Sequence, residues 1–239
     1  MTARIVLISH AATTALQRAA FPMDEPLTDQ ALRRLTTARP LFSPPAATTT
    51  TPRTPTTAGR PPRTADEGTV TTNGEQGASK SDGREAPALE EAAALGPSAR
   101  KVLCGPSQRC LQTAAGLRLE AEPVEALRDW DAGRWAGRTL ADVQAEHPED
   151  VLAWLTDPAS APHGGESLLA LLDRVTAWLA TLHDAGRTLA VTHPAVIRAA
   201  VVHALDAPPQ AFWKIDVPPL AQVTLTSNGR RWHLRLSAP

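Results

Sequence analysis

Three residues able to do chemistry on an anion, His10, Arg109 and His193, each lie at or just beyond the end of a short apolar segment. A neutral imidazole can act as a nucleophile or carry a proton. A guanidinium group presents fixed donors that match phosphate or carboxylate oxygens. These residue types therefore point to acid–base or phosphoryl-transfer chemistry.

The segments that must position these residues cover 3–8, 101–105 and 188–192, and each reads as a buried strand. Helical patterns alternate with them, which predicts an α/β domain with a largely parallel sheet. In such sheets, ligands bind beyond the carboxyl ends of the strands. Pro194 at the first position of a helix also directs backbone N–H groups to that edge. We therefore expect the three side chains to converge there.

The clearest helix covers 167–183, where apolar residues form one stripe. Ser227-Asn228-Gly229, between 223–226 and 232–236, predicts a terminal β-hairpin. Further helices are predicted from Thr28 to Ala38, up to Leu117, from Thr139 onward, and over 149–155.

Residues 43–87 differ from the rest, because Val70 is their one large apolar residue among Thr, Pro, Ala, Gly and charged residues. Such a composition predicts disorder. We expect a single domain, 1–239, interrupted by this insertion after its first helix. A tolerated surface insertion is favoured over a regulatory or tethering loop, because long surface loops cost little stability.

Six short motifs occur in order outside 43–87. They are 5–13 (Ile-Val-Leu-Ile-Ser-His-Ala-Ala-Thr), 26–28 (Pro-Leu-Thr), 106–114 (Pro-Ser-Gln-Arg-Cys-Leu-Gln-Thr-Ala), 127–137 (Leu-Arg-Asp-Trp-Asp-Ala-Gly-Arg-Trp-Ala-Gly), 165–167 (Gly-Glu-Ser) and 191–198 (Val-Thr-His-Pro-Ala-Val-Ile-Arg). In this order they resemble motifs of the histidine phosphatase (phosphoglycerate mutase-like) superfamily. Each motif alone is weakly specific, but the ordered set is strongly so.

The resemblance implies a three-layer α/β sandwich, with helices on both sides of a largely parallel central sheet, and a phosphohistidine mechanism. It assigns the nucleophile to His10 and donors to the phosphoryl oxygens to His193 and Arg109. Asp129 stands where the family has a Glu that protonates the leaving alcohol. Such an acid needs a raised pKa, which we expect from burial beside Trp130 or Trp135.

The sequence departs from the family pattern at the nucleophile. Ser9 occupies the phosphate-binding position of the family's Arg, and Ala11 replaces Gly. Loss of one charged hydrogen-bond partner costs ~1.5–3 kcal/mol, or roughly ten- to hundred-fold in phosphate affinity. Arg18 and Arg128 are candidates to restore the charge.

Four further residues have expected roles. Glu166 is expected to cap and brace the helix after it. His163 is expected to lie in a solvated loop, with a place at the rim of the pocket as the alternative. Trp130 and Trp135 are the tryptophans best placed to contact a substrate, with packing as the default role.

Composition excludes several classes of protein. A net charge of -1 and a pI near 6.7 argue against nucleic-acid or membrane-surface binding. The apolar run 5–8 is too short for a signal peptide, and Cys104 and Cys110 imply no disulfide framework, so we expect a cytoplasmic protein. The spacing of His and Cys predicts no metal site, and no cofactor is expected. Oligomeric state is not indicated.

The favoured hypothesis is a metal-independent phosphohydrolase that acts on a small phosphorylated molecule. One alternative is a binding or regulatory module that has kept the fold and lost catalysis. Another is an enzyme that uses the two-histidine pocket for non-phosphoryl acid–base chemistry. A third is an interaction scaffold that works through residues 43–87.

Overall fold

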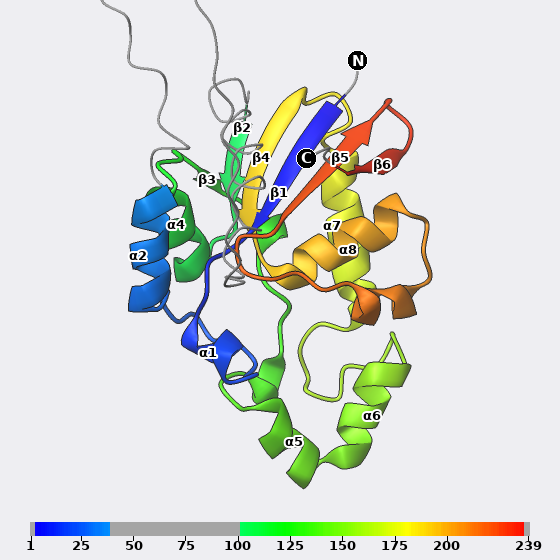
Figure 1. The fold of residues 1–239 in the computed structure, drawn as a ribbon. Coiled ribbons are helices and arrows are strands. Elements are labelled where there is room, and N and C mark those ends of the chain that lie inside the picture. Colours follow the sequence, from blue (N-terminus) through cyan, green and yellow to red (C-terminus); the bar gives the residue numbers. More distant parts are fainter. Residues whose placement is uncertain (1–2, 39–100, 237–239) are drawn as a thin grey trace, which may run out of the picture.

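The computed structural model describes residues 3–38 and 101–236, so the predicted insertion at 43–87 lies outside the described residues (Figure 1). Within them, six strands form one sheet in the order β3-β2-β4-β1-β5-β6. Their bounds are β1 Ala3–Ser9, β2 Lys101–Cys104, β3 Glu122–Pro123, β4 Arg187–Thr192, β5 Gln222–Ser227 and β6 Trp232–Arg235.

The strand register brings the predicted site residues to one edge of the sheet. β1 and β2 both pair in parallel with β4, and Ser9 lies opposite Thr192 in that register. The residues that follow these two strands, His10 and His193, are therefore neighbours. β5 and β6 form the predicted antiparallel hairpin. The pairings β3–β2, β2–β4 and β4–β1 are all parallel, which confirms the largely parallel α/β sheet.

Helices cover both faces of the sheet in three layers (Figure 1). Helices α2 and α4 lie on one face and α7 and α8 on the other, while α5 and α6 lie beyond the carboxyl ends of the parallel strands. The bounds are α1 Thr14–Gln17, α2 Asp29–Ala38, α4 Gln108–Gly116, α5 Leu140–Glu146, α6 Pro148–Thr156, α7 Leu168–Ala180 and α8 Pro194–Ala204. Three 3₁₀ turns are η3 Glu125–Leu127, η4 Gly133–Trp135 and η5 Pro209–Lys214.

The predicted helices are confirmed at their starts. Thr28 and Thr139 accept from backbone N–H groups in the first turns of α2 and α5, as helix caps do. The long helix α7 is shorter than expected, because it ends at Ala180 and Thr181 caps it.

Both faces of the central strand are buried. Ile5 and Leu7 pack in the cluster below α7 and α8, whereas Val6 and Ile8 pack in the cluster below α2 and α4. This two-sided burial is typical of a strand in a parallel sheet and explains its unbroken apolar run. A separate small core, built on Trp135, Val143, Val151 and Trp154, holds α5 and α6 beneath the edge.

No helix in residues 3–38 and 101–236 is both long and apolar enough to span a bilayer.

Candidate active site

His10 is held from two sides at the end of β1. Its backbone N–H donates to the carbonyl oxygen of Thr192 (2.8 Å), and its Nδ1 lies 2.8 Å from the carbonyl oxygen of Ala11. The N–H of Ala11 donates to Thr113 Oγ1 (3.0 Å), which ties this loop to α4. Since a carbonyl oxygen only accepts, Nδ1 carries the proton and Nε2 keeps its lone pair.

The imidazole of His10 is neutral at neutral pH. Burial, helped by the neighbouring His193, lowers its pKa from 6.5 to about 4. A neutral ring with a free Nε2 lone pair is the form that attacks phosphorus.

His193 is fully buried, with its ring centroid 5.3 Å from that of His10. Nδ1 lies 3.2 Å from Asp129 Oδ2, while Nε2 lies 3.3 Å from Ser107 Oγ and 3.4 Å from Cys110 Sγ. Burial by itself lowers the pKa of His193, but the Asp129 carboxylate and then Cys110 outweigh it and raise the pKa to about 9. This imidazole therefore carries a second proton at neutral pH.

Asp129 joins the two cations of the site. Its Oδ2 also accepts from Arg109 Nη2 (2.8 Å), and its Oδ1 accepts from the backbone N–H of Trp130 (2.8 Å). Burial alone raises the pKa of this carboxyl, but His193 and Arg109 outweigh burial and hold it well below its usual range. The expected rise in pKa is therefore wrong, because cations rather than indole rings contact the carboxylate.

Arg109 is 3% exposed and faces two carboxylates. Its Nη1 lies 3.7 Å from Glu25 Oε2 and donates to the carbonyl oxygen of Met23. Its Nε has no hydrogen-bond partner within the described part of the chain. Most of its charge is thus balanced by Asp129 and Glu25. The Nε atom is itself buried, and Arg109 lines a separate pocket beside Met23 and Ser107 rather than the cavity described below.

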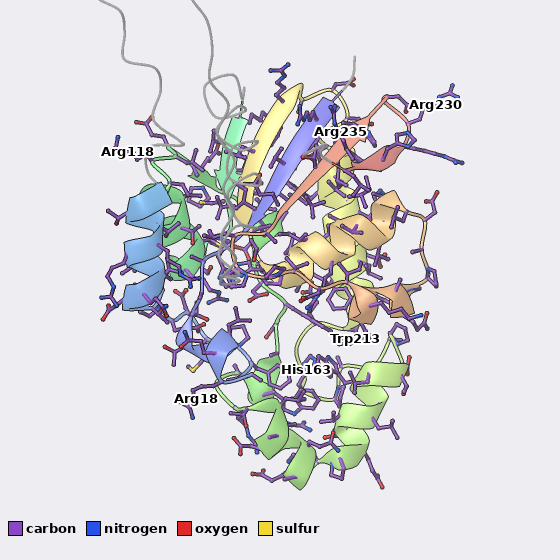
Figure 2. All side chains as sticks on the ribbon, in the orientation of Figure 1. Arg18, Arg118, His163, Trp213, Arg230 and Arg235 are labelled. Carbon is purple, nitrogen blue, oxygen red and sulfur yellow. The ribbon has the colours of Figure 1, made fainter. Side chains whose placement is uncertain are left out.

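Ser9 lies outside the cavity described below. Its side chain is fully buried, and its Oγ donates to the carbonyl oxygen of His10 (3.4 Å), so the structure does not place it at the expected phosphate-binding position. Neither arginine suggested as a substitute lies in the cavity. Arg128 pairs with Glu166 (3.2 Å), and Figure 2 shows the exposed Arg18 extending outward from the end of α1.

A cavity of about 190 Å³ opens beside His10 and Asp129. Most of its lining is apolar or aromatic. Beyond these two residues it is lined by Thr13, Leu16, Ala20, Phe21, Pro22, Trp130, Ala132, Trp154, His163, Pro194, Ala195, Arg198 and Trp213. His193 does not line it and lies behind Asp129.

The cavity lining differs from the sequence-based expectations in two ways. His163 is 3% exposed and lines the cavity, so its expected position in a solvated loop is wrong; burial lowers its pKa. Trp135 is fully buried in the small core and does not line the cavity, whereas Trp130 does. Trp154 and Trp213 line it instead, and no periodic pattern marks them in the sequence.

Arg198 is the cation that sequence reasoning missed. It lies on α8, its Nε donates to the carbonyl oxygen of Ile215 (2.8 Å), and its guanidinium carbon lies 5.6 Å from the ring centroid of Phe212. The only sequence signal was its place in the motif 191–198.

A buried ion pair holds the loop that carries Asp129. Glu166 Oε1 and Oε2 accept from Arg174 Nε (2.8 Å) and Nη2 (2.7 Å). Arg174 Nη1 also donates to the carbonyl oxygens of Ala126 (2.8 Å) and Arg128 (3.2 Å). The pair therefore fixes the backbone on the N-terminal side of Asp129.

The expected capping role of Glu166 is wrong, since Ser167 Oγ accepts from the backbone N–H of Ala170 and caps α7. Glu166 braces this helix through Arg174 instead.

The site thus combines a neutral imidazole, a protonated imidazole, an ionised carboxylate and a guanidinium group paired with that carboxylate. Such a set can attack an electrophilic centre and move a proton to a leaving group. No cluster of three or more His, Cys, Asp and Glu suited to a metal ion occurs in residues 3–38 and 101–236.

Comparison with a family model matches residues 81–238 to the histidine phosphatase superfamily (branch 1). The chain is 30% identical over 153 residues to a bifunctional protein of Mycobacterium tuberculosis, covering 56% of this chain and 42% of that protein. It is 41% identical over 71 residues to a glucosyl-3-phosphoglycerate phosphatase of Mycolicibacterium vanbaalenii, covering 28% and 32%. It therefore spans less than half the length of these curated relatives.

Among solved structures, the fold is similar to an alpha-ribazole phosphatase from Shigella flexneri. The TM-score is 0.66 at 20% identity, with 98% of this chain and 95% of that chain covered. At this identity the likeness concerns the fold.

A histidine titration followed by NMR tests the charge assignment. We expect His10 to titrate near pH 4 and His193 near pH 9, with His10→Asn and His193→Asn assigning the signals. Asp129→Asn should lower the pKa of His193, because burial then acts with less opposition. Because His193 holds its proton more tightly in the folded state, its protonation contributes to the free energy of unfolding. This contribution is complete below pH 6.5 and is lost as pH rises through about 9. Midpoints near 6.5 for both would contradict the assignment.

Urea unfolding tests the buried ion pair. Arg174→Met leaves the carboxylate of Glu166, which is 7% exposed, without its main partner, and we expect a loss of about 3–5 kcal/mol in the free energy of unfolding. Arg134→Met removes a matched pair at the surface, where Arg134 is 56% exposed, and should change it by less than about 1 kcal/mol. Equal losses in the two variants would refute the proposed bracing role.

Proposed function

Because this chain belongs to the histidine phosphatase superfamily (branch 1), we propose that it is a metal-independent phosphatase that hydrolyses a small phosphomonoester through a phosphohistidine on His10. The observation that carries the proposal is the neutral imidazole of His10 at the cavity, with its Nδ1 proton held by the carbonyl oxygen of Ala11. The similarity to a glucosyl-3-phosphoglycerate phosphatase supports this class of reaction.

In the first step of the proposed reaction, His10 Nε2 attacks phosphorus and the bond from phosphorus to the ester oxygen breaks. The ester oxygen leaves as an alcohol and needs a proton. Asp129 borders the cavity but is ionised, so it has no proton of its own to donate to this oxygen. His193 Nδ1 holds one and lies 3.2 Å from Asp129 Oδ2, an ion-pair contact whose angle falls outside hydrogen-bond geometry and must align for transfer. The proton passes from His193 through the Asp129 carboxyl to the leaving oxygen.

In the second step, water attacks the phosphorus of the phosphohistidine. The water proton returns through Asp129 to His193, inorganic phosphate leaves, and the neutral His10 is restored. The proposal also gives the Arg109 guanidinium contact with a phosphoryl oxygen as charge spreads over the phosphoryl group. For this contact the phosphoryl group must reach past Asp129, because Arg109 pairs with Asp129 and does not line the cavity.

A second candidate is a binding module that has kept the fold and lost turnover. One observation favours it: Ser9 supplies no cation, and Arg109 is already paired with Asp129 and Glu25. Phosphate must therefore compete with these carboxylates for the Arg109 guanidinium.

Phosphate release from a panel of phosphomonoesters, with chelator present, tests the proposal. We expect turnover by the wild type and a loss of more than about a thousand-fold in His10→Ala, because the nucleophile is gone. His147→Ala, at an exposed position between α5 and α6, is the matched control and should retain activity. A well-folded wild type without turnover on every ester would favour the binding module, and equal activity in His10→Ala would rule out His10 as nucleophile.

A further inference from the structure

Four aromatic side chains in the lining of the cavity beside His10 form what we call the aromatic wall: Phe21, Trp130, Trp154 and Trp213. The ring centroids of Trp154 and Trp213 lie 4.6 Å apart with planes at 71°, and those of Trp130 and Trp154 lie 5.4 Å apart at 32°. Figure 2 shows Trp213, which belongs to η5, near His163 on the side of η5 that faces α5 and α6. Both residues line this cavity. The wall therefore joins rings from separate elements around one space.

Three polar side chains of the lining each have one atom hydrogen-bonded within the protein. Thr13 Oγ1 accepts from the first turn of α1 (3.3 Å), and His163 Nδ1 accepts from the backbone N–H of Gly165 (3.0 Å). Arg198 Nε donates to a carbonyl oxygen. Most of the rest of the lining is apolar or aromatic, and a hydroxyl of the leaving group buried against that part would lack a partner, which is unfavourable.

The size of the cavity narrows the ligand further. Its lining carries both the ionised Asp129 and the Arg198 guanidinium, so charge does not decide between a neutral and an anionic leaving group. The cavity measures about 190 Å³, whereas an apolar cavity of ~150 Å³ holds a benzene ring. The space therefore suits one small ring system rather than a long chain.

We propose that this cavity binds the leaving group of the substrate and selects a flat aromatic ring, attached to the ester oxygen directly or through one carbon. The inference rests on the proposed phosphatase function, since it assigns the substrate class of that same site. Aromatic rings favour edge-to-face and offset contacts with other rings, which the inclined planes of the wall provide.

The wall is also tied to the reacting groups. The backbone N–H of Trp130 donates to Asp129 Oδ1 (2.8 Å), and its indole Nε1 donates to the carbonyl oxygen of Glu166. The indole of Trp130 is thereby fixed relative to the carboxylate. A ring packed on Trp130 brings its ester oxygen towards Asp129, which places binding energy where the leaving oxygen is protonated.

Binding of phosphonates to the full chain tests the inference without requiring turnover. Benzylphosphonate and cyclohexylmethylphosphonate carry the same charge, have similar size and cannot be hydrolysed. We expect benzylphosphonate to bind about tenfold more tightly by calorimetry, the scale of one aromatic contact set. Trp213→Leu should bring the two affinities within about twofold. Leu152→Ala, 63% exposed on α6, is the control and should keep the difference.

A second variant leaves the wall intact and narrows the space. Ala20→Leu adds bulk to the lining and should weaken benzylphosphonate binding about tenfold. Equal binding of the two phosphonates by the wild type, or no binding of either, would overturn the inference.

Turnover separates this inference from the proposed function. Benzyl phosphate, cyclohexylmethyl phosphate and glycerol phosphate all release an alkyl alcohol, so differences in kcat/KM report the cavity more than the leaving group's acidity. We expect kcat/KM to fall in that order, by about tenfold for each step. Turnover without this preference would overturn the aromatic selection alone. Tighter benzylphosphonate binding without any turnover would overturn the phosphatase proposal and support the cavity's preference.

Discussion

The charge balance around Asp129 is the constraint on which the site depends. One carboxylate contacts Arg109 at 2.8 Å and His193 at 3.2 Å, and this contact keeps His193 protonated against the effect of burial. The protonated His193 in turn helps to keep His10 neutral. The Asp129 carboxylate therefore keeps His193 protonated and, through the charge of His193, helps to keep His10 neutral. Arg174 and Glu166 secure that anion by fixing the loop before it.

The fold separates reactivity from recognition. The edge of the parallel sheet supplies His10 and His193, whose relative position follows from the register of β1 and β4. Helix α6 and η5 supply two of the four rings of the aromatic wall, Trp154 and Trp213, and the α5–α6 unit stands beyond that edge (Figure 1). His10 and His193 directly follow regular strands and are thereby held in fixed positions, while the elements beyond the edge shape the cavity. A change of substrate would then require changes mainly outside the sheet.

The fold and the convergence of His10 with His193 follow from the sequence, because buried parallel strands leave long apolar runs and their ends must meet. The lowered pKa of Asp129 does not follow from the sequence. The direction of this shift depends on contacts with Arg109 and His193 that only the packed structure defines. Burial of His163 likewise depends on tertiary packing. Ser9 was expected at the phosphate because of its motif position, yet the end of β1 buries its hydroxyl.

The central claim is that His10 carries the phosphoryl group during turnover. Its most direct test is rapid alkaline quenching within the first turnover of a phosphomonoester, followed by digestion and mass spectrometry. The account predicts one phosphoryl group on the peptide that contains His10, absent from His10→Ala. A phosphoryl group on any other residue, or substrate turnover with no labelled peptide, would contradict it.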